Sequence, residues 1–312
     1  MRRQVGVTLT GFGAFLLVLA LMSRFFLAGQ LIKFPVNEYS ISRLTGTNVT
    51  YTSRQTGQQV TGATVRAVAT TQGDVSSGTS STAVWTNITG VFDITANPQQ
   101  QGIPIDYTTE RLAFNRRTGE LVNGFGAAVG TARPNFSGQG YVWPIGTQKK
   151  TYQVFNTTLL KPEPAQYTGT TTVNGLSVYV FVEHVSNVPF QSANLAGAQA
   201  NLTATYTYYV DPGTGSPVKI SENQDETVTD PNSGATLVAF QGTLASTPQS
   251  IAAAVHTASV SDAEISGVQD IGPLVAGLVA IVLLVLGMLM ILGSEGDEYE
   301  YEEDEEDMRA RA

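Results

Sequence analysis

Few side chains in this sequence of 312 residues could carry out covalent or metal chemistry. It has no cysteine, and its two histidines, His184 and His256, lie far apart without the spacing of a metal-binding pair. The lack of cysteine excludes thiolate nucleophiles, disulfide bonds and cysteine-bound zinc. The sequence also has no nucleophile elbow and no glycine-rich phosphate loop. We therefore expect a protein that is not an enzyme and that needs no metal and no cofactor.

The acidic residues do not point to catalysis either. The net charge is −9, but the C-terminal run Glu295–Asp307 alone holds 10 of the 26 acidic residues. Residues 30–270 carry 12 basic and 16 acidic residues, with no basic stripe among them and no carboxylate pair singled out by its spacing. A nucleic-acid partner needs a concentrated basic surface. We expect no nucleic acid to bind.

The most distinctive segment places large aromatic side chains beside two lysines. Trp143 and Tyr152 flank the pair Lys149 and Lys150. In one interpretation the segment faces a membrane, with the rings at the interface and the lysines near lipid phosphates. In the other it is a turn that leads into a strand, with the aromatic rings in the core.

Two strand patterns suggest a place for an apolar ligand. Leu202–Val210 alternates, with Leu202, Ala204 and Tyr206 on one face and threonines on the other. Leu176–Val185 is apolar on both faces, so we expect it to be covered on both sides or to line an apolar interior. The candidate lipid contacts on these strands are Val178, Val180, Phe181 and Ala204.

The rest of the central region has the same β character. Glycine, proline and asparagine turns separate threonine- and valine-rich runs, and two similar turns, Asn115–Gly119 and Asp211–Gly215, each fit a hairpin. Thr247-Pro248 fits the start of a helix over 248–262, and Gly272-Pro273 should break or bend the chain. The predicted fold is α+β, a mostly antiparallel domain, either barrel-like or helix-grip-like. Further strands are expected at Thr64–Ala69, Ala83–Thr89, Ile105–Phe114, Lys150–Phe155, Ser216–Ser221 and Ala235–Gly242.

Two apolar segments bracket this domain. Ile271–Leu292 is 22 residues without a charge, enough to cross a bilayer as a helix. The N-terminal segment lacks a clear cleavage site, which favours an uncleaved signal anchor. The expected division is a cytoplasmic N-terminus over 1–4, spans over 5–27 and 271–292, an extracytoplasmic domain over 28–270, and a disordered acidic tail over 293–312.

Because two spans return the chain to its starting side, both termini are expected on the same side of the membrane. Arg2 and Arg3 precede the first span, which by the positive-inside rule favours a cytoplasmic N-terminus. The tail would then be cytoplasmic and the domain outside the plasma membrane.

The chain resembles the actinobacterial PorA-type membrane protein family over nearly its whole length. The resemblance rests on Trp143–Tyr152, on Tyr167-Thr168-Gly169, and on Val173–Leu176 with Tyr179-Val180-Phe181 after it. The hairpin from Tyr209-Val210-Asp211-Pro212 to Thr214-Gly215 and the two spans also match. One departure is Phe155-Asn156, where relatives often carry Trp-Asp.

The resemblance implies a cell-envelope protein with a β-rich domain outside the membrane and a role in handling envelope lipids. We expect a membrane-tethered protein that binds or transfers a lipid or glycolipid during lipoglycan assembly. The alternative is a non-catalytic scaffold that recruits envelope biosynthesis enzymes. A pore is not expected, because a long apolar helix normally halts export at the inner membrane.

Overall fold

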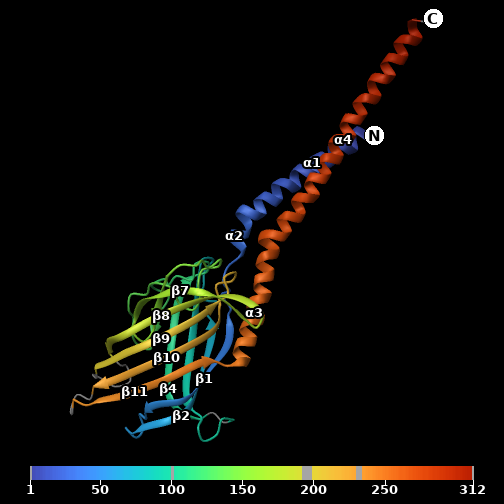
Figure 1. Cartoon of the computed structure of the whole chain (residues 1–312). Coiled ribbons are helices and arrows are strands. Elements are labelled where there is room, and N and C mark those ends of the chain that lie inside the picture. Colours follow the sequence, from blue (N-terminus) through green and yellow to red (C-terminus); the bar gives the residue numbers. More distant parts are fainter. Residues whose placement is uncertain (1, 100–101, 192–198, 230–233, 311–312) are drawn as a thin grey trace. The chain divides into compact units, whose positions relative to one another are not determined.

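The computed structural model describes residues 2–99, 102–191, 199–229 and 234–310, with the side chains of residues 27–28 and 294–310 outside the description. The chain forms two compact units (Figure 1). One is helical and contains Met1–Ile32 and Ala263–Ala312. The other, Lys33–Asp262, is the β domain.

Among the described residues, two helices are long and apolar enough to cross a membrane, within Arg2–Phe26 and Pro248–Gly293. The second begins in the β domain and continues into the helical unit. Large apolar side chains such as Phe15 and Leu278 lie exposed on them, an arrangement that lipid favours and water does not. The elements in chain order are α1 Arg2–Met22, the π-helical turn η1 Ser23–Leu27, α2 Ala28–Leu31, α3 Pro248–Ser266, the π-helical turn η2 Gly267–Ile271 and α4 Gly272–Ala310.

Small residues let α1 and α4 pack closely. A Cβ atom on Gly6 would lie 2.8 Å from the carbonyl oxygen of Gly287, and one on Gly13 would lie 3.0 Å from that of Ala280. As the residue number rises along α1 it falls along α4, so the two helices are antiparallel. Close backbone approach through small residues is the usual way in which apolar helices associate in lipid.

Of the two predicted alternatives at Gly272-Pro273, a break or a bend, the break is wrong, because the chain stays helical there. Residues Gly267–Ile271 form one π-helical turn, and the Gly272 amide donates to the Gly267 carbonyl. Pro273 has no N–H to donate to the Gln269 carbonyl one turn earlier, and that carbonyl accepts from Arg24 Nη1 over 2.9 Å instead. The acidic run that was expected to be a disordered tail lies within the bounds of α4.

In the part of the chain that the structure describes, the β domain is one antiparallel sheet of eleven strands in the order β5-β4-β3-β2-β1-β11-β10-β9-β8-β7-β6. Each strand pairs with its neighbour in sequence, except that β5 and β6 are not paired and β1 pairs with β11. The strands are β1 Tyr39–Thr52, β2 Gln59–Gly73, β3 Thr82–Asp93, β4 Ile103–Asn115, β5 Ala128–Val129, β6 Tyr152–Asn156, β7 Lys161–Val173, β8 Leu176–Gln191, β9 Gln199–Val210, β10 Pro217–Thr229 and β11 Thr236–Ser246.

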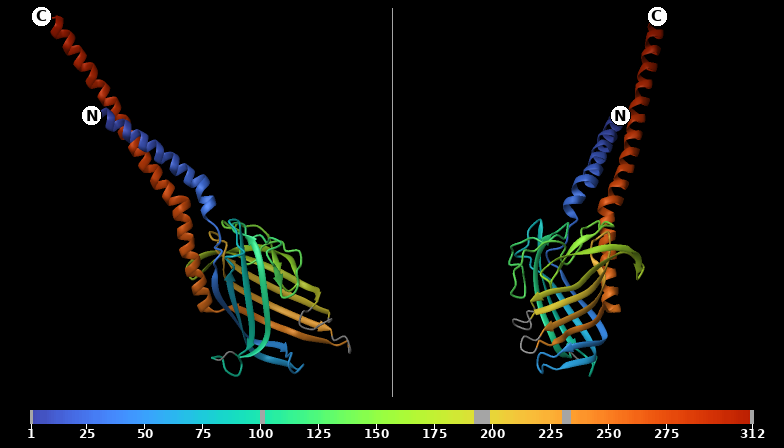
Figure 2. Two further views of the ribbon diagram at one scale, coloured as in Figure 1. Left: turned by 180° about the vertical axis from the view of Figure 1, so that it is seen from behind. Right: turned by 60° about the vertical axis from the view of Figure 1, so that its left-hand side comes forward.

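The sheet curves into a half-barrel (Figure 2). Glu110 on β4 and Glu222 on β10 interact electrostatically although four strands lie between theirs. In a flat sheet five strand spacings would separate them by about 24 Å. The side chains that share their face therefore point to the concave side. At one end of the sheet, Gln139 forms isolated β-bridges with Glu120 and with Val154. These bridges connect the segment after β4 to β6.

The structure confirms the α+β, barrel-like prediction and the helix after Thr247. The Ser250 amide donates to the Thr247 hydroxyl, which caps α3. On its inner side α3 packs Val255 and Ala258 against Val178 and Val218, on the convex face of the sheet. β8, the strand that was expected to be apolar on both faces, therefore packs under α3 on its convex side. On its concave side it lines the interior of the half-barrel.

Candidate functional site

The aromatic residues of the predicted segment lie in the core. Trp143 is 1% exposed, and its ring packs 5.8 Å from that of Phe181 and 5.0 Å from that of Tyr208 between centroids. Tyr152 is buried too and meets Phe181 edge-on at 5.6 Å. The structure therefore favours the packing interpretation for both rings over contact with a membrane.

The two lysines of the segment are exposed. The Lys149 ammonium lies 5.3 Å from the ring centroid of Tyr179, and the Lys150 ammonium lies 5.1 Å from that of Tyr152. Cation–π contacts of this kind hold a cation at the surface without neutralising it. Of the four residues, Lys149 and Lys150 alone remain available to an anionic lipid headgroup.

Backbone hydrogen bonds to the two similar turns hold the segment Trp143–Thr147 in place. Trp143 donates its amide to the Gly215 carbonyl over 2.7 Å, and Thr147 donates to Pro212 over 2.8 Å. From the other side, Ile145 donates to Arg117 over 3.0 Å. The segment is held between the turns Asn115–Gly119 and Asp211–Gly215, which is a structural role.

The candidate lipid contacts on the strands do not form one site. Phe181 and Ala204 are buried on the concave side, but Phe181 packs with Trp143 whereas Ala204 packs with Val185, Leu202 and Tyr206. Val178 lies under α3 on the convex side. Val180 is half-buried on that same convex side.

Glu183 is a fully buried carboxylate on the concave side, and sequence reasoning missed it. Asn156 donates its amide Nδ2 to one carboxylate oxygen over 2.7 Å, and the Tyr208 hydroxyl donates to the other over 2.9 Å. Burial raises the pKa of Glu183, while the two hydrogen bonds oppose that rise. Two donors on a buried carboxylate offset much of its desolvation.

Glu110 and Glu222 are half-buried on the concave side, surrounded by the curved sheet. Burial raises the pKa of each to about 7, and for Glu222 the nearby Glu110 and Glu183 carboxylates add to the rise. Glu222 accepts one hydrogen bond, from Gln224 Nε2 over 2.9 Å. Among the residues that the structure describes, no three histidine, aspartate or glutamate side chains form a metal-binding group.

These two carboxyls predict a pH dependence of stability. Between pH 4.5 and about 7 the folded protein holds protons that the unfolded chain has released, so stability falls as pH rises through this window and levels off above it. After allowance for partial exposure, each carboxyl should account for about 1–2 kcal/mol. Denaturant unfolding from pH 5 to pH 8 measures the slope. Glu222→Gln should flatten it, and an unchanged slope in that variant would contradict the assignment.

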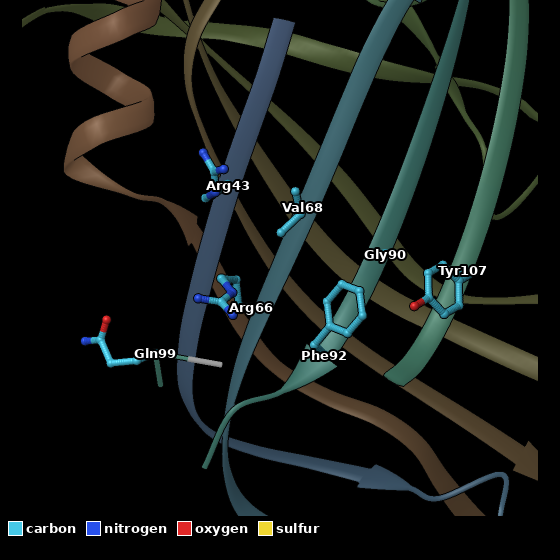
Figure 3. Close-up of a pocket in the computed structure, with 7 residues that line it drawn as sticks. All are labelled: Arg43, Arg66, Val68, Gly90, Phe92, Gln99 and Tyr107. Atoms are coloured by element: carbon cyan, nitrogen blue, oxygen red, sulfur yellow. The ribbon is translucent and has the colours of Figure 1, made fainter. Parts of the chain in front are cut away.

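A groove of about 440 Å³ lies on the convex face of β1 to β4 (Figure 3). Arg43 and Arg66 lie at one end, and Phe92 and Tyr107 lie together at the other. Its lining comprises Arg43, Arg66, Val68, Gly90, Phe92, Gln99 and Tyr107. Sequence reasoning missed this groove, because Gln99 comes from the segment between β3 and β4 and its other residues come from four strands whose register no local pattern specifies.

The fold and the two apolar helices define a membrane protein with a half-barrel β domain between its spans. The chain belongs to the family described as Porin PorA, whose pattern matches residues 5–289. No curated protein is significantly similar to it.

Proposed function

We propose that this protein is held at the membrane by both ends of its β domain and binds a lipid or glycolipid there, in assembly of the cell envelope of an actinobacterium. The observation that carries the proposal is the pair of apolar clusters that the concave face holds besides its carboxyls, in a half-barrel that is not closed along its length. The family and the two apolar helices support a place at the membrane.

Two apolar clusters share that concave face. One is built on β1, β2 and β11 around Val49 and Val65, and the other on β8 and β9 around Leu202 and Ala204. Each has half-buried apolar side chains packed against its buried members. Acyl chains bind to apolar surfaces of this kind because hydrophobic burial does not depend on the orientation of the contacting groups. The half-buried side chains are Val60, Val91, Ile105 and Phe240 in the first cluster, and Leu159, Val188, Phe190 and Tyr208 in the second.

The two spans and the basic residues before the first of them support one orientation. We propose that both termini are cytoplasmic and that the β domain lies outside the plasma membrane, because Arg2 and Arg3 precede the first span. The exposed Lys149 and Lys150 would then meet anionic headgroups from outside.

Neither a pore nor an enzyme is part of this proposal. A membrane barrel is closed and carries an apolar outer band, whereas this sheet has two edge strands, β5 and β6, and polar rows that include Arg43 and Arg66 on its convex face. The concave carboxylate Glu183 already has two hydrogen-bond donors, which fits a structural role.

The test is native mass spectrometry of the full chain, released from membranes of an actinobacterial host, with lipid extraction of the same sample. We expect a lipid to co-purify with the wild type. Ala204→Trp fills space beside Leu202 and Tyr206 and should reduce retained lipid at least about fivefold. Thr207→Trp, on the opposite face of the same strand, is the matched control.

The tryptophan at position 204 could also unfold the domain, so a thermal melt accompanies each variant and Ala204→Leu serves as the milder change. Unchanged lipid in a folded Ala204 variant would count against a site beside β9. A wild type free of lipid would overturn the proposal.

The scaffold function is the second candidate, and one observation favours it. Tyr39 and Ile41 on β1 and Ile88 on β3 lie exposed on the convex face, with 67%, 39% and 52% of their surface accessible. Ile41 and Ile88 both pair with Thr70 of β2, the strand between them. Exposed aromatic and aliphatic side chains that lie together often bind another protein. Cross-linking in membranes should then capture an envelope biosynthesis enzyme, and the triple alanine variant should lose it.

A further inference from the structure

The convex groove combines aromatic and cationic side chains in a fixed register. Arg43, Val68, Gly90 and Tyr107 are directly paired across β1, β2, β3 and β4. Arg66 lies in the next row, opposite Phe92. Because the ladder fixes these positions, the part of the groove that the strands form needs no rearrangement. Gln99 joins it from the connection between β3 and β4.

A glycine in the middle of β3 shapes the aromatic end. A Cβ atom on Gly90 would lie 2.8 Å from the Phe92 ring and 3.1 Å from the Tyr107 ring. The two rings meet edge to face, with centroids 5.6 Å apart at 88°. Phe92 is buried, whereas Tyr107 is 59% exposed. Gly90 thus leaves room for a supported tyrosine ring that is open to a ligand.

The other end of the groove is cationic, in a chain whose net charge is −9. Elsewhere in the domain, Arg54 and Arg111 are each paired with an aspartate over 2.7 Å. Arg43 has no such carboxylate among the described residues, and none of the seven lining residues is acidic. Arg66 donates to the Pro98 carbonyl over 3.2 Å, which holds its guanidinium beside the groove.

We propose that this groove binds a sugar that carries an anionic group, a phosphate or a carboxylate. Guanidinium groups bind both anions through several parallel hydrogen bonds. The C–H face of a sugar ring is apolar and packs on an aromatic ring such as that of Tyr107, while Gln99 offers an amide to hydroxyl groups. The volume of about 440 Å³ lies in the range of small-molecule sites.

This site goes beyond the proposed lipid function, because it lies on the opposite face of the sheet from Ala204. The anionic sugar could be a free glycan or the headgroup of a glycolipid. The two sources share one chemistry, and a soluble sugar phosphate tests that chemistry without a lipid.

The experiment measures binding of glucose 6-phosphate, glucose and inorganic phosphate to the full chain in nanodiscs of zwitterionic lipid, by equilibrium dialysis. We expect glucose 6-phosphate to bind at least about tenfold more tightly than either of the other two. Arg43→Gln should weaken that binding roughly tenfold or more, the usual effect of losing a charged hydrogen bond. Tyr107→Ala should weaken glucose 6-phosphate binding and leave phosphate binding unchanged.

Two control variants each remove a side chain of the same type, an arginine or a tyrosine, that lies outside the groove. Arg117→Gln removes the charge of an exposed arginine in the turn Asn115–Gly119, and Tyr39→Ala removes an exposed tyrosine from the same convex face. Both should bind glucose 6-phosphate as the wild type does. Equal losses in Arg43→Gln and Arg117→Gln, or equal binding of glucose and glucose 6-phosphate, would overturn the proposal.

Lipid extraction of the same preparations separates this inference from the lipid function. We expect Arg43→Gln to keep its co-purified lipid and its melting temperature while it loses the sugar phosphate. Loss of the lipid as well, in a folded variant, would show that the groove is not a separate site. If the wild type retains lipid but binds no sugar phosphate, this inference fails and the lipid function stands.

To test the second source, vesicles that contain an anionic glycolipid replace the soluble sugar. If the chain binds both glucose 6-phosphate and these vesicles, and Arg43→Gln weakens both, the ligand of the groove is a glycolipid headgroup. Binding of the vesicles that is unchanged by Arg43→Gln, without binding of the soluble sugar, would contradict the site.

Discussion

Replacing Gly215 with alanine should lower the free energy of unfolding of the β domain by about 3–4 kcal/mol. Gly215 has φ +77°, in the left-handed region that L-residues other than glycine enter at a cost. A Cβ atom there would also lie 2.3 Å from the carbonyl oxygen of Trp143 and 2.7 Å from that of Pro144. Both obstacles are backbone atoms, so the contact is relieved only if the segment moves.

The expected movement would break a connection that holds one end of the half-barrel. The Trp143 amide donates to the Gly215 carbonyl over 2.7 Å, and the Trp143 ring packs on Phe181 and Tyr208. Displacing this segment would therefore loosen the turn and the aromatic core together. Denaturant unfolding followed by tryptophan fluorescence measures the change.

Gly146→Ala is the matched control. Gly146 also has a positive φ, +75°, and a Cβ atom there would meet nothing within 4 Å. Its replacement should therefore cost only the backbone strain, about 1–2 kcal/mol. Equal losses at the two positions would mean that the close approach of the Trp143 segment contributes nothing to stability.

Local sequence patterns predicted most of the sheet but not all of it. β9 and β8 were expected from alternation and from an apolar run, and both are strands at those positions. β7 was missed because it begins Lys161-Pro162-Glu163-Pro164, and proline argues against a strand. Its prolines pair with β6, a short strand at the edge of the sheet.

β1 was missed for a different reason. Its register shifts between Gly46 and Val49, and Asn48 has φ +58°, so the irregularity interrupts the alternation of side chains. Its second partner, β11, lies about 200 residues further along the chain, as the pair Leu44 and Ser246 shows. No local pattern encodes so distant a pairing.

The candidate site was harder to predict than the fold. Trp143 and Lys149 are close in sequence and looked like one surface, but the ring is buried and the lysine is exposed. Whether a side chain of this segment is buried or exposed depends on the two turns that hold the segment. These turns come from distant parts of the chain. The groove around Arg43 likewise exists only after four strands are in register.

Asn156, the departure noted in the family resemblance, contacts the buried Glu183 in the structure. Its Nδ2 atom donates to the buried Glu183, and its Oδ1 atom accepts from the Thr158 and Leu159 amides over 3.1 and 3.0 Å. An aspartate could still accept from the two amides. It could not donate to Glu183 unless one of the two carboxyls held a proton.

Asn156→Asp should therefore destabilise the domain by about 3–5 kcal/mol at pH 8, where two carboxylates would face each other in a buried site. The folded pair would bind a proton that the unfolded chain releases, so the loss should shrink as pH falls from 8 to 5. Unfolding measured across this range tests the sign. Asn223→Asp, at an exposed asparagine that donates to Thr243, should show neither the loss nor the recovery.

The decisive comparison is the exchange of the two side-chain types, Asn156→Asp together with Glu183→Gln. The new glutamine can donate to the new aspartate and still accept from the Tyr208 hydroxyl, so the exchange restores a donor for each acceptor. It should recover most of the stability at pH 8, and its stability should vary less with pH than that of Asn156→Asp alone. If the exchanged protein is no more stable than Asn156→Asp, the loss comes from altered packing, and the hydrogen bond from Asn156 is not what stabilises Glu183.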